Sequence, residues 1–143
     1  MAITTGKSVY LAKALADHVY GKTTYTGPTT MYLALFSVTP SDGAGGTEAT
    51  GSGYARVSIT NNTTNWTNAT GSTTPAAKTN GVAFAFPAAT GNWSSSSNQV
   101  AWGLFDASSG GNLLHYGPIG TPAPVLNGQT FTFPIASLVI SLQ

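Results

Sequence analysis

The chain has 143 residues, a formal net charge of +1 and charged side chains at only 6% of its positions. A length of this order predicts a single domain that buries enough surface to fold without staples. The lack of cysteine excludes disulfides and thiolate metal ligands. The few Lys and Arg residues form no basic stripe, so we expect no nucleic-acid binding. Nothing predicts a secretory signal or a membrane-spanning segment.

The N-terminal region predicts the one helix of the chain, over residues 5–20. Leu11, Leu15 and Val19 recur at helical spacing and, together with alanines, form one apolar face. Gly21 follows, where helices often end. The apolar stripe either covers a face of the chain's own sheet, which we favour, or docks on a partner subunit. Leu11, Leu15 and Val19 are therefore candidate interface residues.

The remainder predicts about seven short strands. Residues 31–38 are almost entirely apolar, which is typical of a buried central strand. Residues 54–60 and 81–87 alternate apolar and polar side chains, as strands with one buried face do. Further strands are expected at 130–134 and 138–142, and loops at 40–53, 61–80, 88–98 and 117–124.

Residues 100–118 predict a β-hairpin around which the fold is organised. Two apolar segments flank the run Asp106-Ala107-Ser108-Ser109-Gly110-Gly111, whose residue types favour turns. The pair Asn127-Gly128 predicts a second hairpin turn, of type I′.

These elements predict a mainly β fold: an antiparallel β-sandwich, jelly-roll-like, with one N-terminal α-helix. We expect one domain over residues 1–143. Within it, residues 1–24 form the helix and its connection, and residues 25–143 form the sandwich.

Residues suited to catalysis or metal binding are sparse. Asp106 and His115 could join a serine in a triad, but a turn cap and a strand position explain them without catalysis. Asp42 and Glu48 share one loop and could bind calcium, although ordinary loop polarity accounts for both. We therefore expect no enzymatic activity, no cofactor and no metal.

Two tryptophans in polar segments are the other candidates for binding. Trp66 and Trp93 could stack on sugar rings, fill the core or contact another subunit, since interfaces are enriched in tryptophan. We favour the core or an interface, so both are candidate interface residues. Glycan binding is the alternative.

Three stretches of the sequence carry a family resemblance. They read P-T-T-M-Y-L-A-L-F-S-V-T-P-S-D at 28–42, G-T-E-A-T-G-S-G-Y-A-R-V at 46–57 and G-L-F-D-A-S-S-G-G-N-L-L at 103–114. The chain resembles, over nearly its whole length, a family of small structural proteins of tailed bacteriophages, often labelled tail fibre or virion proteins. The resemblance implies a virion component without catalysis and transfers no site residues.

A compact sandwich without repeats suits a capsid decoration or cement protein, or a small tail or tail-fibre-associated protein, better than a fibre shaft. We expect the protein in the virion, after synthesis in the bacterial host cytoplasm. Because the chain has few charged residues, its surface repels other subunits only weakly. We therefore expect a homo-oligomer or binding to a repeating lattice of capsid or tail subunits. The alternative is a carbohydrate-binding, receptor-recognition module that uses Trp66 and Trp93.

Overall fold

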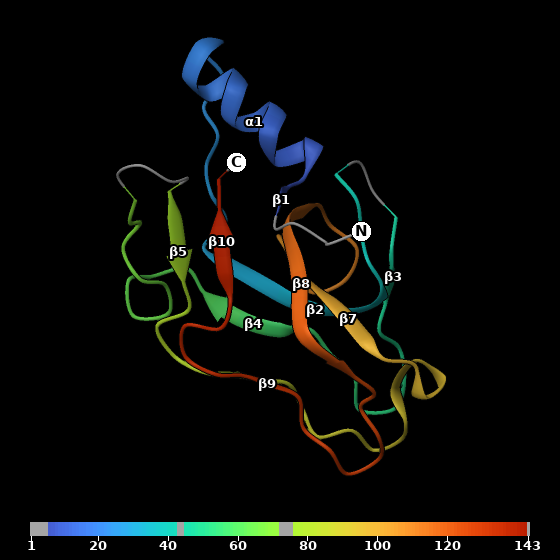
Figure 1. Ribbon diagram of the computed structural model, residues 1–143. Coiled ribbons are helices and arrows are strands. Elements are labelled where there is room, and N and C mark those ends of the chain that lie inside the picture. Colours follow the sequence, from blue (N-terminus) through green and yellow to red (C-terminus); the bar gives the residue numbers. More distant parts are fainter. Residues whose placement is uncertain (1–5, 43–44, 72–75, 143) are drawn as a thin grey trace.

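A six-stranded antiparallel sheet forms the centre of the protein (Figure 1). The computed structural model describes residues 6–42, 45–71 and 76–142. In chain order the elements are β1 (Gly6–Lys7), α1 (Val9–Tyr20), β2 (Thr30–Val38), β3 (Thr47–Glu48), β4 (Val57–Thr60), β5 (Ala77–Thr79), β6 (Phe84–Ala85), a 3₁₀ turn (Trp93–Ser96), β7 (Gln99–Phe105), β8 (Leu113–Ala123), β9 (Thr132–Phe133) and β10 (Val139–Ser141).

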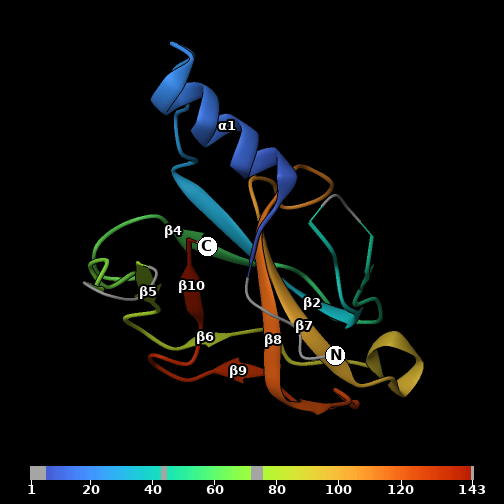
Figure 2. The same cartoon turned by 45° about the horizontal axis from the view of Figure 1, so that its top comes forward.

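The strands of the large sheet follow the order β1-β8-β7-β2-β3, and β4 pairs with the first half of β2. Two further ladders, β5 with β10 and β6 with β9, have two strands each. Figure 2 shows β6, β9 and β10 outside the large sheet, and β10 lies against its strand β8, where His115 Nε2 is 2.9 Å from the Ser141 carbonyl. The expected sandwich-like, mainly β fold with one α-helix is confirmed; the jelly-roll connectivity stays a prediction.

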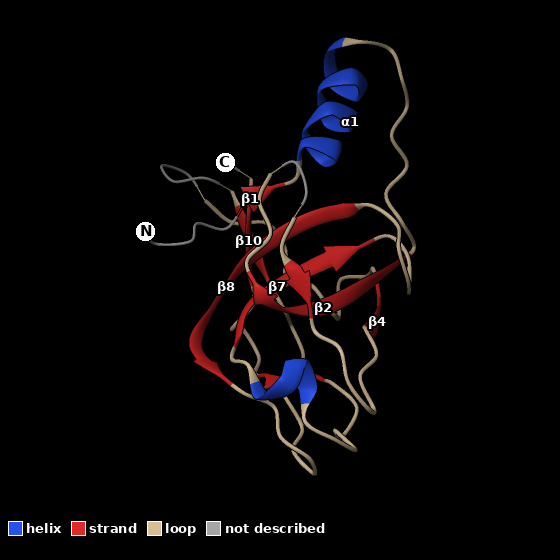
Figure 3. Cartoon of the chain, turned by 90° about the vertical axis from the view of Figure 1, so that its right-hand side faces the viewer, coloured by secondary structure: helices blue, strands red, loops and turns tan. Residues whose placement is uncertain are grey.

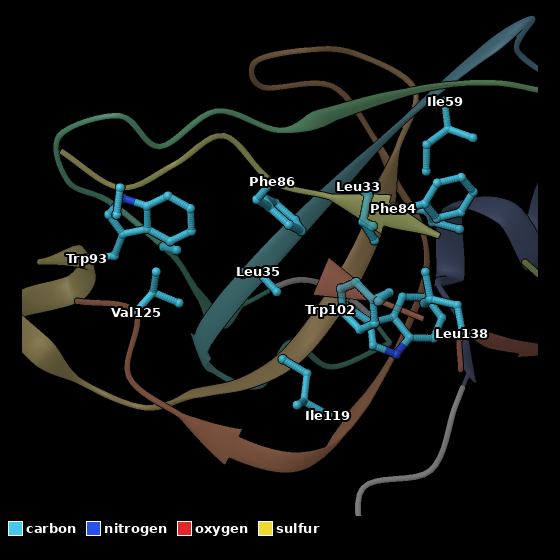
Figure 4. Packing of buried hydrophobic residues seen from close by; sticks show 14 of the residues in the cluster. Leu33, Leu35, Ile59, Phe84, Phe86, Trp93, Trp102, Ile119, Val125 and Leu138 are labelled. Carbon is cyan, nitrogen blue, oxygen red and sulfur yellow. The ribbon is translucent and has the colours of Figure 1, made fainter. Parts of the chain in front are cut away.

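The main core lies on one face of the large sheet. Leu33 pairs with Leu104, and Leu35 pairs with Trp102, across the ladder between β2 and β7. All four side chains are buried, as the apolar character of 31–38 predicts. Aromatic and aliphatic side chains from the two small ladders and the loops complete this core, among them Trp66 and Phe133. Figure 4 shows others of this set: Phe84, Phe86, Trp93, Val125 and Leu138.

The opposite face of the sheet carries a smaller cluster around Phe36. This ring is 3% exposed and stacks on Phe105 with a centroid separation of 6.1 Å. Gly103 lies beneath it, where a Cβ would come within 2.8 Å of a Phe36 ring carbon and 2.9 Å of a Leu113 methyl carbon. A residue without a side chain is therefore required where Phe36 crosses β7.

Strand β8 is longer than the sequence predicts, and the loop expected at 117–124 is wrong. The strand continues through Pro118 and Pro122 to Ala123. Among the described residues, β1 pairs with β8 only at His115 and Tyr116. The prolines therefore lie on an edge, where a missing N–H leaves no ladder bond unmade.

The turn at Asn127-Gly128 forms, but it joins no hairpin. Gln129 N–H donates to the Leu126 carbonyl at 3.0 Å, and Gly128 has φ +84°. Asn127 does not share the positive φ that a type I′ turn needs at both central residues. The expected type I′ hairpin is wrong because the next strand, β9, pairs with β6 and not with β8.

Three loop segments meet at the end of the molecule opposite α1 (Figure 3). We call this set, residues 50–53, 88–98 and 123–131, the loop end. Trp93 N–H donates to the Val125 carbonyl at 2.9 Å, and Ser94 N–H donates to the Thr50 carbonyl at 2.7 Å. Ser94, Ser95 and Ser96 have φ values of 48°, 52° and 66°. Such a left-handed run costs about 1–2 kcal/mol per residue outside glycine, and the hydrogen bonds hold it in place.

Candidate interaction surfaces

Helix α1 begins where strand β1 ends. Ser8 caps it, since its Oγ accepts the Leu11 N–H at 3.1 Å. Ser8 N–H donates to the Leu114 carbonyl at 3.0 Å, and Val9 N–H donates to the Asp42 carbonyl at 2.6 Å. The helix begins later than the predicted residue 5 because residues 6 and 7 pair with β8. These bonds attach one end of α1 to the body of the protein.

The rest of α1 projects from the body (Figure 3), and none of its residues is buried. The favoured expectation that its apolar stripe covers a sheet face is wrong. The physical reason is that Ser8 and Val9 attach the helix to the body at its N-terminal end. Beside this attachment, a pocket of about 300 Å³ that Tyr10 helps to line opens over the second face of the sheet. Phe36 and Phe105 lie on it, and the Arg56 guanidinium covers Phe105 at 3.7 Å from the ring centroid.

The apolar side chains of α1 are consequently accessible. Leu11 and Leu15 are only half-buried, and Val19 of the same stripe is 63% exposed. Val9 is 47% exposed and Tyr20 is 89% exposed on other sides of the helix. Accessible apolar side chains thus lie on the stripe and also outside it, where Val9 and Tyr20 share the helix surface with the exposed Lys13 and Asp17.

The connection after α1 runs back along the helix. Lys22 takes the left-handed conformation (φ 78°), and Thr23 N–H donates to the Asp17 carbonyl at 3.2 Å. Tyr25 N–H donates to Nδ1 of His18 at 3.2 Å. A groove of about 470 Å³ lies between the helix and the connection and is lined by Val9, Tyr10, Lys13, Ala14, Asp17, Thr23, Thr24 and Tyr25.

The two tryptophans proposed for binding lie in the core. Trp66 is 3% exposed and Trp93 is 0% exposed. The Trp93 indole N–H donates to the Ser52 carbonyl at 3.1 Å, and its ring meets Tyr54 edge-on at 5.1 Å. Both tryptophans have polar neighbours in the sequence, so the sequence did not predict that their side chains are buried. In this structure neither indole is placed to contact a sugar or another subunit.

A polar network that the sequence analysis missed joins two of the motifs. Arg56 forms a two-pronged ion pair with Glu48, through Nε at 2.8 Å and Nη2 at 2.7 Å. Its Nη1 donates to the Ala107 carbonyl at 2.7 Å and the Gly110 carbonyl at 2.8 Å. The Arg56 side chain is 6% exposed. This arginine therefore fastens the β7–β8 turn to the segment before β4.

Tyr54 completes the network. Its hydroxyl donates to Glu48 Oε1 at 2.9 Å and accepts the Leu35 N–H at 3.2 Å. Burial, with the neighbouring Glu48 carboxylate, raises the pKa of Tyr54. Both Glu48 carboxylate oxygens already accept hydrogen bonds from Arg56 or Tyr54. The cluster of Glu48, Tyr54 and Arg56 therefore has a structural role. The residues that form this network stand in the sequence motifs T-E at 47–48 and G-Y-A-R at 53–56 and in the turn that begins at Asp106.

The other candidate residues for chemistry also have structural partners. The Asp106 carboxylate accepts bonds from Asn112 N–H at 2.7 Å and Asn112 Nδ2 at 2.8 Å, as expected of a turn cap. His115 Nε2 lies 2.9 Å from the Ser141 carbonyl, and its ring stacks on Trp102. Burial lowers the pKa of His115.

The two residues considered for calcium are likewise engaged. Asp42 Oδ1 accepts the Tyr116 hydroxyl, and burial together with this bond raises the pKa of Tyr116 to about 12. Glu48 binds Arg56. Across residues 6–42, 45–71 and 76–142, no three His, Asp or Glu side chains gather as metal ligands would. In the same part of the chain, no helix has the length and apolar character to cross a membrane.

Comparison with protein families adds to this picture. The family described as Podophage GP4 fiber I protein gp80 matches the chain over residues 6–141. The chain belongs to this family. No individual curated protein matches the chain.

Membership agrees with the resemblance inferred from the sequence motifs. The family identifies the chain as a structural, virion-associated component of a tailed bacteriophage. The matched region begins at β1 and ends in β10. It therefore includes the projecting helix, the Arg56 network and the loop end.

Proposed function

We propose that this protein is a non-enzymatic structural part of the phage fibre apparatus and that α1 attaches it to the virion. The observation that carries the proposal is a helix of 12 residues with none buried. Isolated helices of this length are marginal in water, so most gain their stability from packing against a partner. Leu11, Leu15 and Val19 are the proposed contact residues.

The partner that fits α1 is a groove on another virion protein. Exposed apolar residues lie on more than one side of the helix, with Val19 on the stripe and Tyr20 outside it the most exposed. Two copies packed along the Leu11–Val19 stripe would leave the sides of Val9 and Tyr20 in water. A groove encloses more of the circumference, as in other helix-in-groove complexes.

A fibre-associated position fits better than capsid decoration, because the family is one of fibre proteins. The domain is a compact sandwich and lacks the repeats of a shaft, so we assign it to an attachment or adaptor position. Tail structures repeat subunits around a closed axis. We therefore propose that several copies are arranged around the tail, each held by its own α1.

The test places a charge on the stripe without weakening the free helix. Val19→Lys puts a cation near the helix C-terminus, where the helix dipole favours it, and Val19 is 63% exposed. We expect an unchanged unfolding midpoint and loss of the protein from purified virions. Asp17→Asn is the matched control, since it also raises the net charge by one but lies on the opposite side of α1.

Virions that contain the Val19→Lys protein at wild-type levels would refute the attachment role of α1. A self-associated purified protein whose oligomer is dissociated by Val19→Lys would instead identify a second copy as the occupant of the stripe.

A further inference from the structure

The charged residues are divided unevenly between the helical end of the chain and the rest of the protein. Residues 6–25 carry three lysines and one aspartate, which is a net charge of +2 with histidine neutral. Residues 26–143 carry two basic and three acidic side chains, which is a net charge of −1. The end of the molecule that carries α1 is therefore its cationic end.

Two lysines beside the helix surface have no counter-ion within the protein. In the body, Glu48 is paired with Arg56, and Asp106 caps its own turn. Lys13 and Lys22, by contrast, are exposed, and neither ammonium group forms an ion pair or a hydrogen bond with another described residue. Both cations are therefore accessible to carboxylates of a partner.

Lys22 occupies a backbone position that favours glycine. Its φ of 78° lies in the left-handed region, directly after Gly21 at the end of the helix. Glycine adopts this conformation without steric cost, whereas lysine is disfavoured there. Local chemistry alone would thus select glycine at position 22. Backbone strain of this kind is a reason to look for a functional contact of the side chain.

The two lysines lie outside the apolar stripe of Leu11, Leu15 and Val19. At about 100° per residue, Lys13 lies on the side of α1 opposite the stripe. Lys22 follows the last helical turn, at the tip of the projecting helix (Figure 3). A groove that holds the stripe on its floor would therefore meet both lysines at its rim.

We propose that the groove that receives α1 on the partner virion protein has an acidic rim, with carboxylates opposite Lys13 and Lys22. This inference rests on the attachment role proposed for α1 and adds the chemistry of the partner. Lysine stems can pack along apolar surface while their ammonium groups reach carboxylates at the rim. Complementary charges of this kind steer association and exclude partners of like charge.

Other occupants of the helix surface fit these charges less well. A second copy of α1 would bring its own lysines toward Lys13 and Lys22. An anionic lipid surface also attracts lysine, but helices that lie on membranes have a strongly cationic polar face. In α1 the acidic Asp17 follows Lys13 by one turn on the same side. A protein rim can place single carboxylates opposite the lysines and away from Asp17.

The variant Lys22→Gly separates the loss of charge from any loss of stability. It removes a cation and places glycine where the backbone favours it, so the unfolding midpoint should stay equal or rise. Lys13→Gln removes the other cation and keeps a good helix former. Lys78→Gln is the matched control, because it removes the same charge from β5, outside the helix.

Attachment is measured on virions that carry each variant in place of the wild-type chain. Purified virions are equilibrated at increasing NaCl concentration, and the retained and released protein is quantified by mass spectrometry. The Debye length falls from about 10 Å at 0.1 M salt to about 3 Å at 1 M. Because salt screens the proposed contacts, the wild-type protein should be released as the NaCl concentration rises.

The variants should be released in a defined order. At 0.1 M-order NaCl, Lys13→Gln and Lys22→Gly should each show a retained-to-released ratio about fivefold lower than wild type. Lys78→Gln should behave as the wild type does. Asp17→Asn should be released at higher NaCl than the wild type, since it removes a negative charge that faces the acidic rim.

The acidic rim is overturned if the wild-type protein is retained up to about 1 M NaCl, or if Lys13→Gln and Lys22→Gly are released as Lys78→Gln is. Binding of the free protein to phosphatidylglycerol vesicles that Lys22→Gly weakens, with unchanged release from virions, would also overturn it and assign the lysines to lipid. Loss of Val19→Lys from virions together with wild-type release of both lysine variants would sink the acidic rim alone. Normal incorporation of Val19→Lys would sink the attachment role itself.

Discussion

Replacement of Arg56 by alanine tests the network that joins the β7–β8 turn to the rest of the sheet. The change removes both bonds to Glu48 and both bonds to the turn carbonyls. Breaking a buried ion pair by removing one partner costs about 3–5 kcal/mol. The Glu48 side chain is 28% exposed and keeps part of its hydration, which places the expected loss near the lower limit, at about 3 kcal/mol.

Urea unfolding measures this loss. With a slope of about 2 kcal/mol/M, the midpoint should fall by about 1.5 M. Arg56→Lys should recover only part of the loss, since an ammonium group lacks the planar fork that serves Glu48 and the two carbonyls together. Lys13→Ala is the control, because Lys13 is exposed on α1 and should change stability by less than about 0.5 kcal/mol. Equal midpoints for Arg56→Ala and Lys13→Ala would refute the assigned role.

Three further outcomes follow from the core. Burial lowers the pKa of His115 in the folded protein below its usual 6.5. Below about pH 6.5 the unfolded chain therefore binds more protons than the folded protein does. The free energy of unfolding should decline from pH 7 to pH 5, and it should decline less steeply in His115→Gln. Gly103→Ala should cost about 1–3 kcal/mol by crowding Phe36, and an unchanged melting temperature would contradict this. Trp93→Ala should cost about 3–5 kcal/mol, detectable as a large loss of midpoint; a stable variant would mean that the indole does not support the core.

Local patterns predicted the parts of the fold that local chemistry decides. The apolar run 31–38 became β2, and Asp106 caps the turn between β7 and β8. The helical spacing of Leu11, Leu15 and Val19 predicted α1. In each case neighbouring residues contain the information, because periodicity and turn preference act over a few positions.

Long-range packing was beyond the reach of those patterns. Trp93 is surrounded by polar residues in sequence, but Tyr54 and Phe86 surround it in space. The stripe of α1 correctly indicated an apolar face but not what lies against it. Whether that face meets its own sheet depends on how Ser8 and Val9 bond to Leu114 and Asp42, which lie at distant positions in the chain.

Strand pairing in this protein has a consequence for how the chain folds. The central ladder joins Phe36 to Ala101, and β5 pairs with β10 far along the sequence. Ladders between distant segments form slowly, because a long loop must close before its contacts contribute stability. During synthesis the apolar strand β2 leaves the ribosome well before β7 can pair with it. β3 and β4 can pair with one edge of β2 early, but the newly made chain spends time with the β7 edge of β2 unpaired, so its yield should depend on temperature and chaperone supply.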